Sequence, residues 1–472
     1  MSNIKLQFYG ATQTVTGSCF KLDIKNGSYL IDCGMFQGVD VQDNNYIDFQ
    51  FDPSSIKAVF LSHAHLDHCG LLPKLVKKGF SGKIYLTHQT SELVKIILKD
   101  SAKLQELREK MGQSDLPMIY NSIDVEKAIS QFQTVNYYEE INLTSDVKFV
   151  FIPTGHILGS VNVLIKINDE SILFSGDIGR RVQSIIKRFS DYNNKIFQPN
   201  YIIMESLYGG KIHSNRDENM SRLVKIINES ASHNRTIIIP VFALHRAQEL
   251  LELLKIFFER GLIDKKIQVF LDSPMAIDIT EIYKNNMQEF NEHYHIIDRD
   301  IIYSNEQKDL SIIANNHDRF DFEQLKSVRK SKKSQRIGYN KSAIILAGSG
   351  MADGGRVVRH IQNVIEDSNN SIVFVGYQAE NTLGRQLVDG ASKVEINGKI
   401  LQVKAKIEYL RGFSAHADND DLLAWLFNYD LTRLQRVFLV HADVDRASVF
   451  KEILASKNIA AYIPKLGEEY II

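Results

Sequence analysis

The chain has few cysteines, and their number argues against a disulfide framework. Its 472 residues include three, Cys19, Cys33 and Cys69. An odd and sparse count disfavours paired disulfides and agrees with a reducing compartment. We therefore expect a cytoplasmic location.

The chain also lacks a long apolar run. A membrane helix needs about 18 or more apolar residues in succession, and no stretch approaches that length. The most apolar stretch, Thr236–Leu244, is short and interrupted by Pro240, which favours a buried strand. The first ten residues show neither the apolar region nor the cleavage site of a secretory signal. We expect no membrane association.

A basic surplus is missing as well. Lys and Arg number 56, Asp and Glu 57, and the formal net charge is −1. Because nucleic-acid-binding proteins usually carry a basic surplus, any such role must depend on local patches. One short run is basic enough to form such a patch, and it contains Lys326, Arg329, Lys330, Lys332, Lys333 and Arg336. Such a run steers nucleic acid in some proteins but is more often a solvated face.

The order of predicted strands and helices indicates three segments. The first combines strands and tight turns with a long helix expected over residues 91–111, which is typical of an α/β sandwich. In the second, helices alternate with buried strands, which indicates a parallel sheet. We set the segments at 1–208, 209–394 and 395–472. The polar, lysine-rich residues 302–339 are expected to include a mobile surface loop.

The strongest chemical signal is a run of three histidines and one aspartate. His63, His65, Asp67 and His68 directly follow the strand expected over Ala58–Ser62. Imidazole and carboxylate are ligands that zinc prefers. His63 and His65 face the same way on an extended loop, whereas Asp67 and His68 turn into the next helix and reach a second ion. The alternative is a polar loop that happens to be rich in histidine, which four ligands in six residues disfavour.

Two later residues complete this candidate shell. His156 follows an apolar strand, and Asp177 lies between Gly176 and Gly179, where glycine lets the backbone approach closely. An aspartate between two metal ions can bridge them. Alone, each residue is more often a cap or turn residue than a ligand. Their order after the histidine run makes ligation the better interpretation.

These motifs resemble the metallo-β-lactamase superfamily, and within it the β-CASP group of nucleic-acid-processing hydrolases. The resemblance covers nearly the whole chain. It includes LIDCG around Asp32, MESLYGG around Glu205, GFSAH ending at His416 and FLVH ending at His441. It implies a four-layer αββα metallo-β-lactamase sandwich with an inserted β-CASP domain that contains a mostly parallel sheet.

The resemblance further implies two zinc ions per chain. Ligands of the first would be His63, His65 and His156. Ligands of the second would be Asp67, His68 and His441, with Asp177 bridging the two ions. Asp32 would orient the histidine ligands or the attacking water.

The chemistry expected from such a site is phosphodiester hydrolysis. Two zinc ions can share a hydroxide and clamp phosphate oxygens while the hydroxide attacks phosphorus in line. His416 is our choice for the general acid, held and oriented by Glu205. Without the resemblance, a histidine at a helix start and an acid at a strand end are the plainer interpretations. We count Asp32, Asp67, Glu205 and His416 as catalytic.

Candidate phosphate contacts lie in the later segments. Ser349, Gly350 and Ser414 are on glycine-containing loops whose N–H and hydroxyl groups can hold a phosphate. Arg246 can add a charge, although a salt bridge at a helix start is the plainer interpretation. The sequence departs from the family at His245, where glycine is usual, and at Ala442-Asp443, where Gly-Glu is usual.

We therefore predict a zinc-dependent ribonuclease that acts on single-stranded RNA, with a homodimer as a further expectation. His441 favours RNA over DNA, because the DNA-repair branch of the family typically has valine there. Three alternatives stay open: a thioester or lactone hydrolase, a redox diiron enzyme and a non-catalytic scaffold of an RNA-processing complex. The diiron enzymes usually carry glutamate at the position of His65.

Overall fold

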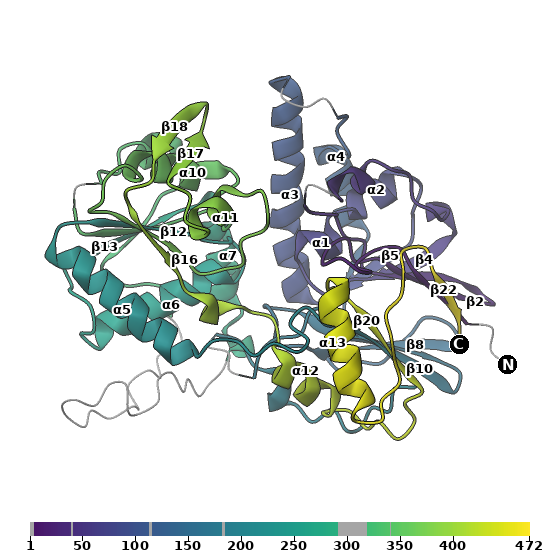
Figure 1. Ribbon diagram of the computed structural model, residues 1–472. Helices are drawn as coiled ribbons and strands as arrows, with labels where there is room; N and C mark the ends of the chain where they lie inside the picture. Colours follow the sequence, from purple (N-terminus) through teal and green to yellow (C-terminus); the bar gives the residue numbers. More distant parts are fainter. Residues whose placement is uncertain (1–3, 39–40, 113–115, 182–184, 291–318, 340) are drawn as a thin grey trace. The chain divides into compact units, whose positions relative to one another are not determined.

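The computed structural model describes residues 4–38, 41–112, 116–181, 185–290, 319–339 and 341–472 (Figure 1). The chain divides into two compact units. Unit 1 comprises residues 1–212 and 416–472, and unit 2 comprises residues 213–415. Of the surface loop expected at 302–339, the part up to residue 318 lies outside the described residues.

Unit 1 contains two seven-stranded sheets. In spatial order, the first sheet consists of β22 (Glu469–Ile471), β1 (Lys5–Phe8), β2 (Phe20–Ile24), β3 (Gly27–Ile31), β4 (Ile56–Phe60), β5 (Lys83–Leu86) and β6 (Phe132–Thr134). The second consists of β21 (Ala461–Tyr462), β20 (Arg436–Val440), β11 (Tyr201–Glu205), β10 (Glu170–Phe174), β9 (Val161–Ile167), β8 (Val147–Pro153) and β7 (Ile141–Asn142). Each sheet combines antiparallel and parallel pairs.

The main core of unit 1 lies between these sheets. Aromatic rings meet across the layers, with centroids 4.7 Å apart for Phe60 and Phe149 and 6.0 Å apart for Phe20 and Phe174. Side chains alternate along a strand, so each strand of the second sheet also presents side chains on its other face. Those side chains are apolar too. They pack on Trp425 and neighbouring residues of α12 (Asn419–Leu426) and α13 (Val444–Ala455).

Helices cover the opposite side of the first sheet, which completes the four layers (Figure 1). They are α1 (Leu66–Cys69), α2 (Leu72–Lys77), α3 (His88–Lys110) and α4 (Ser122–Ser130). The Thr87 hydroxyl accepts a hydrogen bond from the Thr90 N–H and so caps α3 at its start. The predicted αββα sandwich is confirmed.

Unit 2 is built on a six-stranded sheet in which every pair is parallel. Its spatial order is β14 (Leu325–Ser327), β13 (Gln268–Asp272), β15 (Ala343–Ala347), β12 (Thr236–Pro240), β16 (Ser371–Phe374) and β19 (Lys406–Tyr409). Parallel sheets are buried on both faces, and every residue of β12 and β15 is accordingly buried. Residues 395–415, which we had placed in the third segment, group with unit 2, because β19 pairs with β16.

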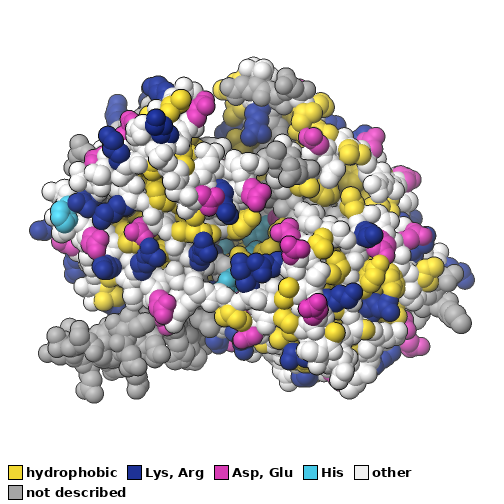
Figure 2. Space-filling view, in the orientation of Figure 1, with side chains coloured by type: hydrophobic (Ala, Val, Ile, Leu, Met, Phe, Trp, Pro, Cys, Tyr) yellow, Lys and Arg dark blue, Asp and Glu magenta, His cyan; other side chains and the backbone are white. Residues whose placement is uncertain are grey.

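Helices of unit 2 connect the parallel strands. They include α5 (Arg216–Ser232), α6 (Arg246–Glu259), α7 (Pro274–Asn285), α9 (Ser331–Ser334), α10 (Gly355–Val364) and α11 (Leu383–Val388). Over the part of the chain that is described, no helix is both long and apolar enough to cross a membrane. Basic and acidic side chains are intermingled over the face shown in Figure 2, in keeping with the small net charge.

Candidate metal centre

The candidate metal ligands of unit 1 come from the ends of strands in both sheets. His63 and His65 follow β4 of the first sheet, and Asp67 and His68 follow on α1. In the second sheet, His156, Asp177 and His441 follow β8, β10 and β20. Gly176 has a φ of +55°, and a Cβ on it would lie 2.8 Å from the Cβ of Ser62. Glycine at 176 therefore lets the two sheets bring these residues together.

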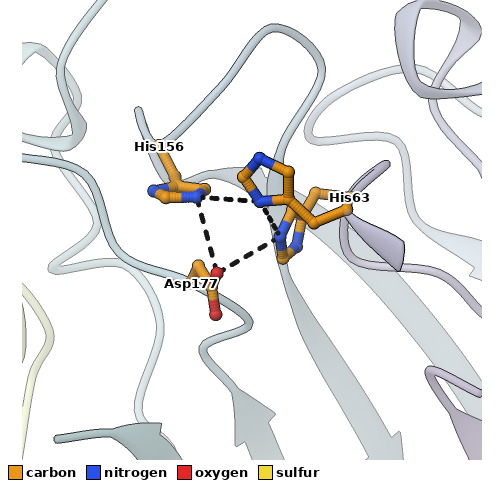
Figure 3. Close-up of side chains that lie close together, drawn as sticks. His63, His156 and Asp177 are labelled. Carbon is orange, nitrogen blue, oxygen red and sulfur yellow. Dashed lines mark hydrogen bonds and ion pairs between the residues drawn. The ribbon is translucent and has the colours of Figure 1, made fainter. Parts of the chain in front are cut away.

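One group of ligand atoms consists of three imidazole nitrogens and one carboxylate oxygen. Asp177 Oδ2 lies 3.3 Å from His63 Nε2 and 3.4 Å from His156 Nε2. His65 Nδ1 lies 3.1 Å from His63 Nε2 and 3.3 Å from His156 Nε2. Figure 3 shows the side chains of His63, His156 and Asp177 pointing toward one another. These atoms surround one point.

A second group surrounds the other oxygen of Asp177. Asp177 Oδ1 lies 3.2 Å from His68 Nε2 and 3.5 Å from His441 Nε2. Asp67 Oδ2 lies 3.4 Å from His441 Nε2 and 3.9 Å from His68 Nε2. All seven predicted metal ligands thus form two adjoining groups that share Asp177.

The spacing of these atoms fits tetrahedral zinc. At zinc–ligand distances of about 2.0–2.1 Å, tetrahedral ligand atoms lie about 3.3 Å apart. Most of the separations above are within a few tenths of this value. His68 Nε2 and Asp177 Oδ1 are also buried without a hydrogen-bond partner. Buried polar atoms are rarely left so, and a cation between them supplies the missing interaction.

Protonation states in the first group also suit metal binding. Burial, followed by the nearby His68, lowers the pKa of His63. Burial and the neighbouring His63 lower the pKa of His65 to about 3. Burial, with His416 nearby, holds the pKa of His156 well below its ordinary value. These imidazoles are therefore neutral near pH 7 and offer a lone pair to a cation.

Asp32 and Ser62 orient His68 and His63 through the ring nitrogens that face away from Asp177. Asp32 Oδ2 lies 2.7 Å from His68 Nδ1, which directs His68 Nε2 toward Asp177. Ser62 Oγ donates to Asp32 Oδ2 at 2.8 Å and lies 3.0 Å from His63 Nδ1. A proton on His63 Nδ1 completes this chain and leaves His63 Nε2 as the ligand atom.

The sequence interpretation missed Ser62. Its fully buried side chain links Asp32, His63 and His68, which makes it part of the support for both ligand groups. The only signal in the sequence was a small hydroxyl residue between an apolar strand and the first histidine.

His416 and Glu205 lie beside the ligand groups. Glu205, at the end of β11, is fully buried, and its Oε1 accepts from the Ile178 N–H at 2.6 Å. His416 Nδ1 lies 3.3 Å from the same oxygen and 3.9 Å from Asp177 Oδ2. Burial disfavours the charged imidazole, but the carboxylates of Glu205, Asp177 and Asp67 together outweigh it, with Glu205 contributing most, and raise the pKa of His416 to about 9. A histidine held protonated at neutral pH is suited to donate a proton.

The predicted phosphate contacts belong to unit 2, whereas the metal ligands belong to unit 1. Ser349 and Gly350 follow β15, and Ser414 follows the short helical turn Arg411–Phe413. Arg246 starts α6, is buried, and pairs with Glu249, which also pairs with Arg216 at 2.6 Å. The salt bridge that we gave as the plainer interpretation of Arg246 is therefore present.

Comparison with protein families matches three successive parts of the chain. Residues 13–210 match the metallo-β-lactamase superfamily, and residues 247–387 match the Beta-Casp domain. Residues 400–464 match the Zn-dependent metallo-hydrolase RNA specificity domain. The three matches together account for most of the chain.

Named relatives extend over the same length. The chain is 30% identical to "Ribonuclease TTHA0252" of Thermus thermophilus, with 98% of each chain covered. It is 28% identical to the "RNase J-like protein" of Methanocaldococcus jannaschii, covering 98% of this chain and 99% of the relative. It is 27% identical to "Cleavage and polyadenylation specificity factor 73" of Drosophila melanogaster, covering 98% of this chain and 64% of that protein.

A solved structure supports the fold alone. A protein of unknown function from Enterococcus faecalis matches with a TM-score of 0.56 and 13% identity over the full length of both chains. Family matches, relatives and motifs agree with one another. The chain therefore belongs to the metallo-β-lactamase superfamily and, within it, to the β-CASP metallo-hydrolases whose named members include ribonucleases and RNA-processing factors.

Proposed function

We propose that the chain is a zinc-dependent ribonuclease that hydrolyses phosphodiester bonds of single-stranded RNA. The observation that carries the proposal is the position of Asp177, whose two carboxylate oxygens each face a separate group of ligand atoms. The match to an RNA specificity domain and the ribonuclease relatives support RNA as the substrate.

The ligand set suits an anionic substrate. Because an imidazole coordinates a cation in its neutral form, five histidines and two aspartates would leave two bound dications with a formal surplus of about two positive charges. Zinc ions so held supply Lewis acidity toward phosphate oxygens and lower the pKa of water to near neutrality. Asp32 and Ser62 keep His63 and His68 directed at the ligand positions.

His416 acts as the general acid in this proposal. Glu205 accepts from His416 Nδ1, which leaves Nε2 to carry the proton for the departing ribose oxygen. Because Glu205 is fully buried and fixed by the Ile178 N–H, it orients the imidazole as well as stabilising its charge.

Purified protein should be incubated with single-stranded RNA labelled at the 5′ end or the 3′ end. We expect cleavage that is lost on chelation and in a His65→Ala variant, and product lengths that report polarity. His88→Ala is the matched control, because His88 is an exposed histidine of unit 1. Full activity after chelation, or hydrolysis of a thioester or lactone with RNA left intact, would contradict the proposal.

The homodimer and the cytoplasmic location remain predictions. Light scattering of the purified chain tests the first of these. A mass close to 53.8 kDa would show a monomer.

A further inference from the structure

We propose that unit 2 carries a second contact surface for single-stranded RNA, formed by the exposed side chains of residues 326–336. We call these residues the basic segment. They contain six basic residues and no acidic one: Lys326, Arg329, Lys330, Lys332, Lys333 and Arg336. Since the whole chain has a net charge of −1, this concentration of one sign is local. The choice of RNA rests on the proposed function, whereas the surface itself does not.

Most of these charges are available to a ligand. All six side chains are exposed. Arg329 forms an ion pair with Asp278, whereas none of the other five has an acidic partner among the described residues. Lys326 instead lies over the ring of Phe270, with its Nζ 5.9 Å from the ring centroid. The exposed hydroxyls of Ser327 and Ser331 add further donors.

The backbone of the basic segment is fixed from both ends. The segment begins within β14, which pairs with β13 at the edge of the sheet. Val328 and Ile337, on either side of the lysine cluster, are buried in the core of unit 2. Between them, the buried Ser334 donates a hydrogen bond to Asp272 Oδ2. The lysines therefore extend from a chain whose course is already set.

Arg356 of α10 adds a second anchor beneath the segment. Its Nη1 donates to Asp272 Oδ1 at 2.6 Å and to the Val328 carbonyl at 2.8 Å. Its Nη2 donates to the Arg329 carbonyl at 2.6 Å. One guanidinium thus ties the segment to a fully buried carboxylate. Binding to a surface ordered in advance costs less conformational entropy.

The chemistry of this surface fits a polyanion better than a protein partner. Protein interfaces depend on a few buried aromatic or aliphatic anchors. Over the described residues 319–339, no large apolar side chain is exposed. Lysines without acidic partners attract phosphates regardless of base sequence, and such contacts extend the hold on a long strand.

RNA binding should be measured in a His65→Ala background, in which RNA is expected to stay intact. Three full-length proteins are compared by fluorescence anisotropy with a labelled uridine homopolymer of about 30 nucleotides. One carries no other change, one carries K330Q, K332Q and K333Q, and one carries K451Q, K457Q and K465Q. The last is the matched control, because it removes three exposed lysines of unit 1. Circular dichroism confirms that the variants are folded.

We expect the basic-segment variant alone to bind more weakly. Each phosphate contact contributes about 0.7 to the slope of log K against log salt for a single strand, so three lost contacts lower it by about 2. A slope that is unchanged by the three basic-segment substitutions would overturn the inference. So would an equal fall in slope in both triple variants, which would show a response to total charge only.

Cleavage by the same lysine variants, made without His65→Ala, separates this inference from the proposed function. In the basic-segment variant we expect KM for long RNA to rise, while kcat on an RNA of a few nucleotides is unchanged. If wild-type protein cleaves no RNA but the slope still falls, the surface stands and the proposed function fails. If RNA is cleaved and the slope is unchanged, the surface alone fails.

Discussion

Asp177 of unit 1 and Asp272 of unit 2 are both buried carboxylates at strand ends, but their surroundings differ. Asp272 receives hydrogen bonds from Ser334 and Arg356 and lies 2.7 Å from His360 Nε2. Four imidazole nitrogens lie within 3.5 Å of the Asp177 carboxylate, and its Oδ1 has no hydrogen-bond partner. Both carboxylates lie beside histidine, so residue type alone does not tell a metal site from a structural one. A ligand site is distinguished by a carboxylate that the protein itself leaves unsatisfied.

The largest effect expected from this comparison is at Asp177. Asp177→Ala removes an oxygen from both ligand groups. Because a metal Lewis acid contributes several kcal/mol to the transition state, RNA cleavage should fall by about 10³-fold or more. Single-turnover cleavage of labelled RNA measures the loss. Activity within about tenfold of wild type would show that Asp177 bridges nothing.

The next effect concerns the proton donor beside Asp177. His416→Asn should lower cleavage by about 10²–10⁴-fold, the usual contribution of a general acid. Since the pKa of His416 is raised to about 9, the protonated form is present below that pH and is lost above it. Wild-type activity should therefore decline on the alkaline side.

Glu205→Gln tests the cause of this pH dependence. Removing the carboxylate removes what raises the pKa of His416, so the alkaline decline should begin at a lower pH. A pH–rate profile of kcat/KM measures the shift. An unchanged profile would mean that another group donates the proton.

The comparison predicts a stability effect at Asp272 in place of a catalytic one. Asp272→Ala leaves His360 buried and Arg356 largely so, both without their carboxylate, and removing one partner of a buried pair costs about 3–5 kcal/mol. The free energy of unfolding, from urea titration, should fall accordingly while zinc content per folded chain is unchanged. Zinc loss without destabilisation would reverse the assignment of the two carboxylates.

The smallest effect is expected at Ser62. Ser62→Ala breaks the link between Asp32 and His63, and loss of such a supporting hydrogen bond weakens metal binding by about 10–100-fold. Competition with a chromophoric chelator measures zinc affinity directly. Ser62→Thr retains the hydroxyl and should restore the affinity, whereas failure of both variants alike would indicate a packing defect.

Much of the fold was predictable because its elements have local signals. Strands such as β12 are apolar runs of the right length, and Asn26 lies in the two-residue turn that connects β2 to Gly27, the first residue of β3. The end of unit 2 was not predictable in this way. Residues 395–415 contain strands like those of unit 1, and only the pairing of β19 with β16 assigns them.

The site shows the same limit. His63, His65 and His68 could be identified because the ligands lie within a few residues of one another after a strand. Ser62 could not, because its role depends on Asp32, which is thirty positions away in the sequence. The burial of Arg246 beside Glu249 likewise depends on tertiary packing.

A pair of cations bound around Asp177 is central to the proposed activity, and the zinc-to-protein ratio tests for it directly. Elemental analysis of the dialysed wild-type chain should give two zinc ions per chain, and Asp177→Ala should retain at most one. Less than one zinc per wild-type chain, with ribonuclease activity intact, would contradict it.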